Sequence, residues 1–243
     1  DQDILHLLDY PAYFDLLELP LPDGRGAILE ALERDRLVIR ASAEVWSITN
    51  LGAILFAKRI EGFTRLKRKA VRVVQYHGRD RTETIREQLG SKGYASGFEG
   101  LLTFVNGLLP ANERVGQALR RTVRMFPELA VRELVANALI HQDFSSTGNG
   151  PLIEVFEGRI EITSPGEPLV DIERFLDSPP TSRNELLASL MRRFRICEER
   201  GSGIDKVVAQ VELYQLPPPL FEVPPGSTRI VLFAPRPLAE MDK

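Results

Sequence analysis

The chain has 243 residues, of which 43% are apolar and 27% are charged, and this composition is that of a globular protein with one large domain or two modest ones. Its net charge of −3 argues against nonspecific nucleic-acid binding by the whole chain, and it holds no apolar run of membrane-spanning length. Cys197 is the single cysteine, which excludes an intrachain disulfide and suits a cytoplasmic location without a membrane partner.

The first 60 residues are predicted to form an N-terminal connector that contains a helix and a hairpin. Apolar residues at helical spacing predict a helix over Gly26 to Arg36. Two short strands, Leu37 to Arg40 and Val45 to Ile48, should come after it. This order is typical of the end of a winged-helix unit, although no basic recognition helix precedes it. Because the sequence opens on Asp1, we expect a piece of a longer protein.

Residues 61–243 are predicted to form the larger domain, in which helices and strands are mixed. A helix at 51–58 is expected at the end of the connector. Within the larger domain, expected helices lie at 83–89, 99–109, 127–141, 184–195 and 203–213, and expected strands at 70–76, 151–156, 159–163 and 228–234. Glu157-Gly158 should turn the hairpin between two of these strands. Such mixing favours an α+β fold over a strictly alternating parallel α/β fold.

The helix that Pro127 opens has two faces of different character. One face carries an apolar stripe made by Val131, Leu134, Val135, Ala138 and Leu139. The other carries Glu133, Asn137 and His141, which are spaced at intervals of one helical turn. Small apolar residues flank this polar row, whereas a solvated face would be more charged. The pattern indicates a second surface that faces the protein interior or a ligand.

A carboxylate one turn away from an amide suits phosphate chemistry. The Asn137 oxygen could ligate a Mg²⁺ ion that is bound to phosphates, because Mg²⁺ prefers hard oxygen ligands. The Glu133 carboxylate could then orient an attacking water. Taken alone, such a pair is more often an exposed glutamate and a structurally satisfied asparagine, so the phosphate interpretation requires support from other segments of the chain.

The segments after this helix strengthen the phosphate interpretation. The predicted hairpin runs into Ser164-Pro165-Gly166, where a glycine lets the backbone approach a ligand closely. Gly201-Ser202-Gly203 then opens the helix at 203–213, and free N–H groups at such a helix start form an anion site.

In this order the motifs resemble the GHKL superfamily of ATP-binding domains, which covers gyrase, heat-shock-90, histidine-kinase and mismatch-repair proteins. The chain is more closely similar to bacterial ATP-binding proteins described as transcriptional regulators, which carry a Schlafen-like AlbA domain ahead of the ATPase-like domain. The segments that carry this similarity are 132–144, 161–166, 182–185 and 197–206, with 13–14 and 48–56 before them.

The resemblance implies a Bergerat-type α/β sandwich, with a mixed sheet covered by helices on one face, that binds ATP and Mg²⁺. It implies that Asn137 ligates the metal and that Glu133 activates water. Other residues that it places at the nucleotide are His141, Asp143, Ser164, Gly166, Arg183, Asn184, Gly201, Ser202 and Gly203. It also implies that DNA is bound through flanking domains outside this chain.

Two alternatives remain open from the sequence. Ser164 stands where the GHKL turn has an adenine-reading aspartate, which favours a degenerate domain that mediates homodimerisation or another interaction. Basic runs at 65–72 and 191–195 would instead support nucleic-acid binding, which the acidic balance opposes.

Overall fold

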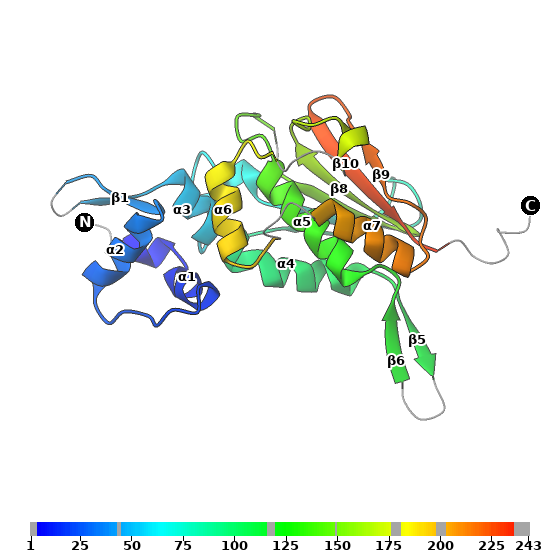
Figure 1. Cartoon of the computed structure of the whole chain (residues 1–243), viewed down its shortest axis with the longest axis horizontal. Helices are drawn as coiled ribbons and strands as arrows, with labels where there is room; N and C mark the ends of the chain where they lie inside the picture. Colours follow the sequence, from blue (N-terminus) through cyan, green and yellow to red (C-terminus); the bar gives the residue numbers. More distant parts are fainter. Residues whose placement is uncertain are drawn as a thin grey trace, which may run out of the picture.

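The computed structural model describes residues 4–42, 45–115, 120–148, 150–175, 181–197 and 203–235. They form a mixed α+β fold, in which a six-stranded sheet is covered by helices and joined to a smaller helical N-terminal part (Figure 1). Short 3-10 segments lie at Ile4–Leu7, Ile60–Gly62, Lys67–Lys69 and Ile172–Arg174. Within these ranges, no helix is both long and apolar enough to cross a bilayer.

The N-terminal part has the predicted helix and hairpin. Helix α1 is Tyr10–Leu16, α2 is Arg25–Arg34 and α3 is Asn50–Phe56, while strands β1 (Val38–Arg40) and β2 (Trp46–Ile48) pair antiparallel. The Thr49 hydroxyl accepts from Gly52 N at 2.9 Å, so it caps the start of α3. The apolar core runs without interruption from this part into the rest of the chain.

The main sheet has the strand order β4-β3-β7-β8-β10-β9. Its strands are β3 (Arg72–Tyr76), β4 (Thr84–Leu89), β7 (Leu152–Phe156), β8 (Arg159–Pro165), β9 (Leu220–Glu222) and β10 (Ser227–Phe233). Strands β3 and β7 are parallel and the other neighbours are antiparallel, which makes the sheet mixed. A separate antiparallel pair is formed by β5 (Ala111–Val115) and β6 (Arg120–Arg124).

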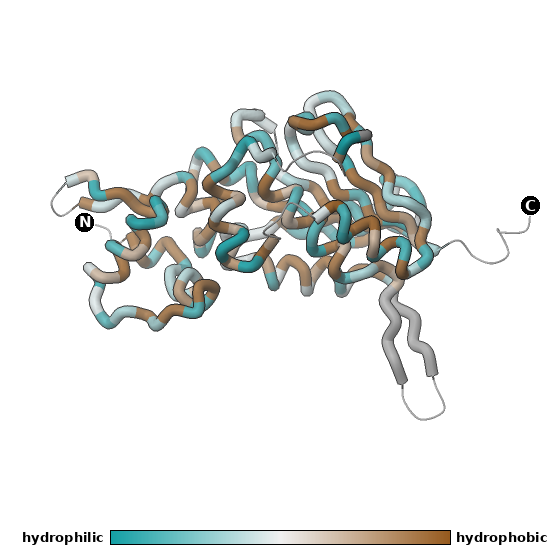
Figure 2. The backbone as a smooth tube through the Cα atoms, in the orientation of Figure 1, coloured by the Kyte–Doolittle hydropathy of each residue, from teal (hydrophilic) through white to brown (hydrophobic). Residues whose placement is uncertain are grey.

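The two faces of the sheet differ because side chains alternate along each strand. Ile153, Ile162 and Ile230 point into the apolar core, where hydrophobic stretches of the strands and helices meet (Figure 2). On the opposite face, the buried carboxylates of Glu154 and Glu161 both bind the Arg81 guanidinium, at 2.7–2.9 Å. A buried charge needs such a partner. Because these ion pairs satisfy the two carboxylates, this face of the sheet does not need a covering helix.

The helical layer on the apolar face consists of α4 (Tyr94–Leu108), α5 (Glu128–His141) and α7 (Gly203–Leu213) (Figure 1). Helix α6 (Glu185–Arg193) lies between this layer and the N-terminal part. Just after α6, the Phe194 ring makes edge-to-face contacts with Tyr13 and Phe56, with ring centroids 6.1 and 5.4 Å apart. The end of α6 is thereby fixed to α1 and α3.

Three sequence predictions need correction or extension. The segment 83–89 was predicted as a helix but forms the edge strand β4, because pairing with β3 overrides the helical propensity of its Glu, Arg and Gln residues. The predicted helix at 99–109 begins earlier, at Tyr94. Strands β5, β6 and β9 were not expected, because they are short and lack a clear apolar alternation.

Candidate functional site

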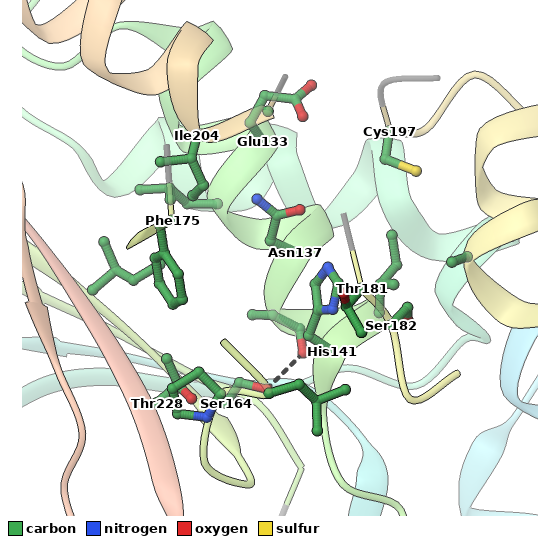
Figure 3. A pocket seen from close by; sticks show the side chains of 18 of the residues that line it. Glu133, Asn137, His141, Ser164, Phe175, Thr181, Ser182, Cys197, Ile204 and Thr228 are labelled. Carbon is green, nitrogen blue, oxygen red and sulfur yellow. Dashed lines mark hydrogen bonds between the residues drawn. The ribbon is translucent and has the colours of Figure 1, made fainter. Parts of the chain in front are cut away.

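A pocket of about 420 Å³ opens between the sheet and the helical layer (Figure 3). Strands β8 and β10 form its floor and α5 forms one wall. Helices α6 and α7 and residues of 168–175 and 181–183 surround its mouth. Its volume lies within the range of small-molecule sites. The pocket therefore lies where the sequence motifs converge.

The polar row of α5 faces this pocket as predicted. Glu133, Asn137 and His141 all line it, one above the other along the helix (Figure 3). Glu133 is only 2% exposed, which is rare for a carboxylate. The Asn137 amide makes no side-chain hydrogen bond to any residue in the described ranges. It therefore offers a free amide oxygen and amide hydrogens to a ligand.

The start of α7 lies directly against this row. A Cβ atom added to Gly203 would lie 3.1 Å from Glu133 Oε2 and 3.5 Å from Asn137 Nδ2. Only a glycine leaves this gap unfilled, so the amino end of α7 can approach both side chains. Gly201 and Ser202, which the sequence assigned to the same turn, lie outside the described residues.

Three side chains, one from the C-cap of α5 and two from other segments, satisfy carbonyls at the end of α5. Ser164 Oγ donates to Ala138 O at 2.9 Å, and Gln142 Nε2 donates to Leu139 O at 3.0 Å. Asn184 Nδ2 donates to the carbonyls of Ile140 and Gln142, both at 2.7 Å. These bonds replace the helical partners that the end of a helix lacks. Asn184 therefore joins α6 to α5, and it is not among the residues that line the pocket.

The turn after β8 brings Gly166 against Asp143 and Arg183. Gly166 has a φ of +98°, and an added Cβ would lie 2.7 Å from Arg183 Nη1 and 2.8 Å from Asp143 Cβ. Asp143 accepts from the backbone N and hydroxyl of Ser145, which lowers the pKa of its carboxyl, and it lies 3.7 Å from Arg183 Nη1. Arg183 lines the pocket. Asp143 and Gly166 lie next to Arg183 but are not among the lining residues.

His141 stands at the bottom of the polar row, with its ring in the pocket (Figure 3). His141 is exposed toward the pocket, yet nearby protein atoms remove part of the hydration of its ring, and the Arg183 and Arg192 cations act in the same direction. Together they lower the pKa of His141 from its ordinary value of 6.5. The imidazole is therefore neutral at pH 7 and can both donate and accept a hydrogen bond.

The opposite part of the pocket is apolar and was largely missed from the sequence. Its walls are Leu134, Ile162, Leu169, Phe175, Ile204 and Ile230. Phe175 lies in the loop that the sequence described only as Pro-, Ser- and Arg-rich, and its ring packs edge to face on Phe221 at 5.5 Å. Thr228 also lines the pocket and donates from Oγ1 to Gly166 O at 2.8 Å. No sequence signal pointed to Thr228, because its place opposite Ser164 depends on the β8–β10 register.

Four of the eight basic side chains in the two runs contact other parts of the molecule. Arg193 Nη1 lies 2.7 Å from Asp35 Oδ1, and Arg195 pairs with Glu18. Lys69 is 4% exposed, and its Nζ donates to Ser146 O at 2.7 Å. Arg72 binds Glu87. Packing therefore accounts for half of these side chains, and Arg192 lines the pocket.

The described residues contain no cluster of three or more His, Cys, Asp or Glu side chains that could hold a metal ion. Most ligands of a divalent ion at this site would therefore be waters or oxygens of the bound substrate. This condition fits Mg²⁺, which keeps several waters and is often bound through substrate phosphates and one or two protein oxygens. Asn137 supplies one such oxygen.

Comparison with known proteins supports an ATPase-like domain. Residues 148–232 match the family described as "Putative ATP-dependent DNA helicase recG C-terminal". This match covers β7, β8, α6, α7, β9 and nearly all of β10, and it leaves α5 outside. No curated protein matches the sequence.

A crystal structure with a similar fold is that of the DIP2311 protein from Corynebacterium diphtheriae, with a TM-score of 0.73 and 20% sequence identity. The similarity covers 98% of this chain and 47% of the other chain. It therefore extends over the N-terminal part as well as the sheet, and this chain spans about half the length of that protein.

The lowered pKa of His141 can be measured by NMR titration of its imidazole signals. The signals that are missing from the spectrum of His141→Gln belong to His141. We expect a value below 6.5 in the folded chain and a partial rise in Arg183→Ala, because one cation is removed while the desolvation remains. Arg65→Ala, an exposed arginine outside the pocket lining, serves as the control. As pH falls below about 6.5, the unfolded chain takes up this proton first, so stability should fall. A pKa at or above 6.5 would contradict the assignment.

Proposed function

We propose that this chain is an ATP-binding domain of the GHKL type and that its pocket takes a Mg²⁺-bound nucleotide. The observation that carries the proposal is the unengaged Asn137 amide, which lies in the pocket beside the buried Glu133 and the amino end of α7. One oxygen ligand, one carboxylate and the amino end of a helix are the components that a metal–phosphate group requires.

The phosphates would lie at the α7 end of the pocket. The N–H groups at the start of α7 would donate to phosphate oxygens, and the helix dipole favours the negative charge there. Asn137 would hold Mg²⁺, which supplies positive charge to the phosphates when it is bound. Gly203 makes this approach possible because it leaves open the space next to Glu133 and Asn137.

The base would lie at the floor of the pocket, near β8 and β10. There the Ser164 hydroxyl already donates its proton to Ala138 O, so toward the pocket it can only accept. Ser164 can therefore replace a carboxylate as a neutral acceptor for an exocyclic amino group such as that of adenine. The Phe175 ring and the aliphatic walls would bury the faces of the base.

Slow hydrolysis is the activity that we assign to Glu133. Its carboxylate would accept a hydrogen bond from the attacking water and orient it toward the terminal phosphate. A deeply buried position protects this carboxylate from competing solvent and holds it near the start of α7.

The nucleotide would act as a signal to other parts of a longer regulatory protein that bind DNA. Helix α6 supports such a path, because Asn184 at its beginning holds the end of α5 and Phe194 at its end contacts Tyr13 and Phe56. A shift of the pocket mouth around Arg183 would therefore reach the N-terminal part directly.

Nucleotide binding can be tested by calorimetric titration of the chain with ATP in the presence and absence of Mg²⁺. We expect Mg²⁺-dependent binding that Asn137→Ala weakens by about 1–3 kcal/mol, because a ligand of the metal is lost. Gln88→Ala, an exposed amide on β4, should bind like the parent. Equal binding by Asn137→Ala would remove Asn137 from the site. No binding by the parent would favour the non-catalytic interaction domain.

If Glu133 orients the attacking water, replacing it should slow ATP hydrolysis without weakening ATP binding. Glu133→Gln keeps the size of the side chain but cannot act as a base, so phosphate release should fall by about 10²–10⁴-fold while ATP affinity changes little. The measurement is single-turnover hydrolysis alongside the titration. Unchanged turnover would show that another group positions the water.

A further inference from the structure

Arg192 brings to the pocket a positive charge that no residue of the described ranges neutralises. Its side chain is half-buried and lines the pocket. No hydrogen bond or ion pair joins its guanidinium to another residue in the described part of the chain. Its neighbours differ, because Arg193 pairs with Asp35 and Arg195 pairs with Glu18. Within the described ranges, Arg192 is therefore the one arginine at the end of α6 that faces the pocket without a partner.

Contacts at both ends of α6 set the position of Arg192 relative to α5. Asn184, just before α6, donates to a carbonyl in the last turn of α5 at 2.7 Å. Just after α6, Arg195 O accepts from the guanidinium of Arg132, which lies in the first half of α5. Helix α6 therefore runs back along α5, and Arg192 lies level with the middle of α5, where Asn137 faces the pocket.

The Arg192 side chain extends along the pocket toward the end of α5. Side chains on a helix point toward its amino end, and the amino end of α6 lies beside the last turn of α5. Desolvation lowers the pKa of the His141 imidazole most, and the Arg183 and Arg192 cations lower it further. Such an effect requires Arg192 to lie near His141. The guanidinium therefore lies beside the part of the polar row that runs from Asn137 to His141.

The charge of the pocket lining favours an anionic ligand. Among the described lining residues, Arg183 and Arg192 outnumber the single carboxylate, which is that of Glu133. Arg183 already donates to Glu167 O and lies 3.7 Å from Asp143 Oδ2. A half-buried charge without a partner is costly, and a guanidinium can bind two phosphate oxygens at once. Arg192 therefore fits a ligand that carries phosphate.

The three residues after Arg192 all contact the N-terminal part. Arg193 Nη1 lies 2.7 Å from Asp35 Oδ1, just after α2. Phe194 packs on aromatic rings of α1 and α3, and Arg195 pairs with a glutamate that follows α1. The last turn of α6 therefore contacts the pocket through one residue and the N-terminal part through the next three.

The end of α6 is a rigid connection between these two contacts. Arg195 has a φ of +56°, the left-handed conformation in which glycine is usual at the end of a helix. Ile196 N donates to Met191 O at 2.9 Å, which closes this turn. No glycine lies between Arg192 and Ile196. A restraint on Arg192 therefore reaches the following residues without a flexible joint.

We propose that Arg192 binds the phosphates of the nucleotide and transmits their presence to the N-terminal part through the three residues that follow it. This inference rests on the proposed nucleotide site. A phosphate held by Arg192 restrains the last turn of α6, and the contacts of residues 193–195 extend that restraint to α1, α2 and α3. Without phosphate, the turn loses this restraint.

The first test is calorimetric titration of the full chain with Mg²⁺–ATP and with adenosine, which carries no phosphate. We expect Arg192→Ala to weaken ATP binding by about 10–100-fold, because a charge-assisted contact is lost, and to leave adenosine binding unchanged. Arg192→Lys should recover part of the affinity for ATP, because it keeps the charge but not the planar fork. Arg65→Ala is the matched control, because Arg65 is an exposed arginine of the other basic run, outside the pocket lining.

The pattern of losses separates this inference from the proposed function. Equal losses of ATP and adenosine binding in Arg192→Ala, or no loss of ATP binding, would overturn the phosphate contact and leave the nucleotide site in place. A parent chain that binds neither ligand would refute the nucleotide site and this inference with it.

The second test is hydrogen–deuterium exchange of the α1 and α3 amides at saturating Mg²⁺–ATP. In the parent, these amides should exchange more slowly than in the unliganded chain, because the end of α6 restrains both helices. Arg192→Ala should lose this slowing even when its pocket is saturated, whereas Arg65→Ala should keep it. Slowing that persists in saturated Arg192→Ala, or that is absent from the parent, would overturn the proposed transmission.

Discussion

The hydrogen-bonding requirement at the end of α5 determines how the site is assembled. The last turn of this helix has carbonyls without helical partners, and Ser164, Gln142 and Asn184 supply the missing donors. Because Ser164 belongs to β8 and Asn184 begins α6, the same bonds fix the floor and the mouth of the pocket relative to α5. The polar row of the helix therefore faces a space of defined shape.

The division of α5 into two faces gives the pocket its chemical character. Leu134, Val135 and Leu139 are buried in the core and set the rotation of the helix. That rotation leaves Glu133, Asn137 and His141 directed to the pocket, next to the glycine that begins α7. A buried carboxylate, an unengaged amide and a neutral imidazole in one row form a site for a polar ligand rather than a surface for solvent.

The polar row, the turn at Gly166 and the glycine at the start of α7 could be predicted from the sequence, because each depends on local spacing. The strand β4 could not, because its residues favour a helix and only the pairing with β3 makes them extended. Phe175 and Arg192 were missed at the pocket for a similar reason, since long-range packing places them there. The capping role of Asn184 also depends on a helix more than 40 residues away in the sequence.

The central claim is that the pocket between α5, α7 and the sheet holds a Mg²⁺-bound nucleotide, and thermal unfolding with and without Mg²⁺–ATP tests it most directly. A ligand that binds only the folded chain at 100 times its dissociation constant should stabilise the chain by about 2.7 kcal/mol. We predict such a rise in the unfolding temperature with Mg²⁺–ATP, and little change with Mg²⁺ alone. An unfolding temperature that stays constant up to millimolar Mg²⁺–ATP would contradict the account.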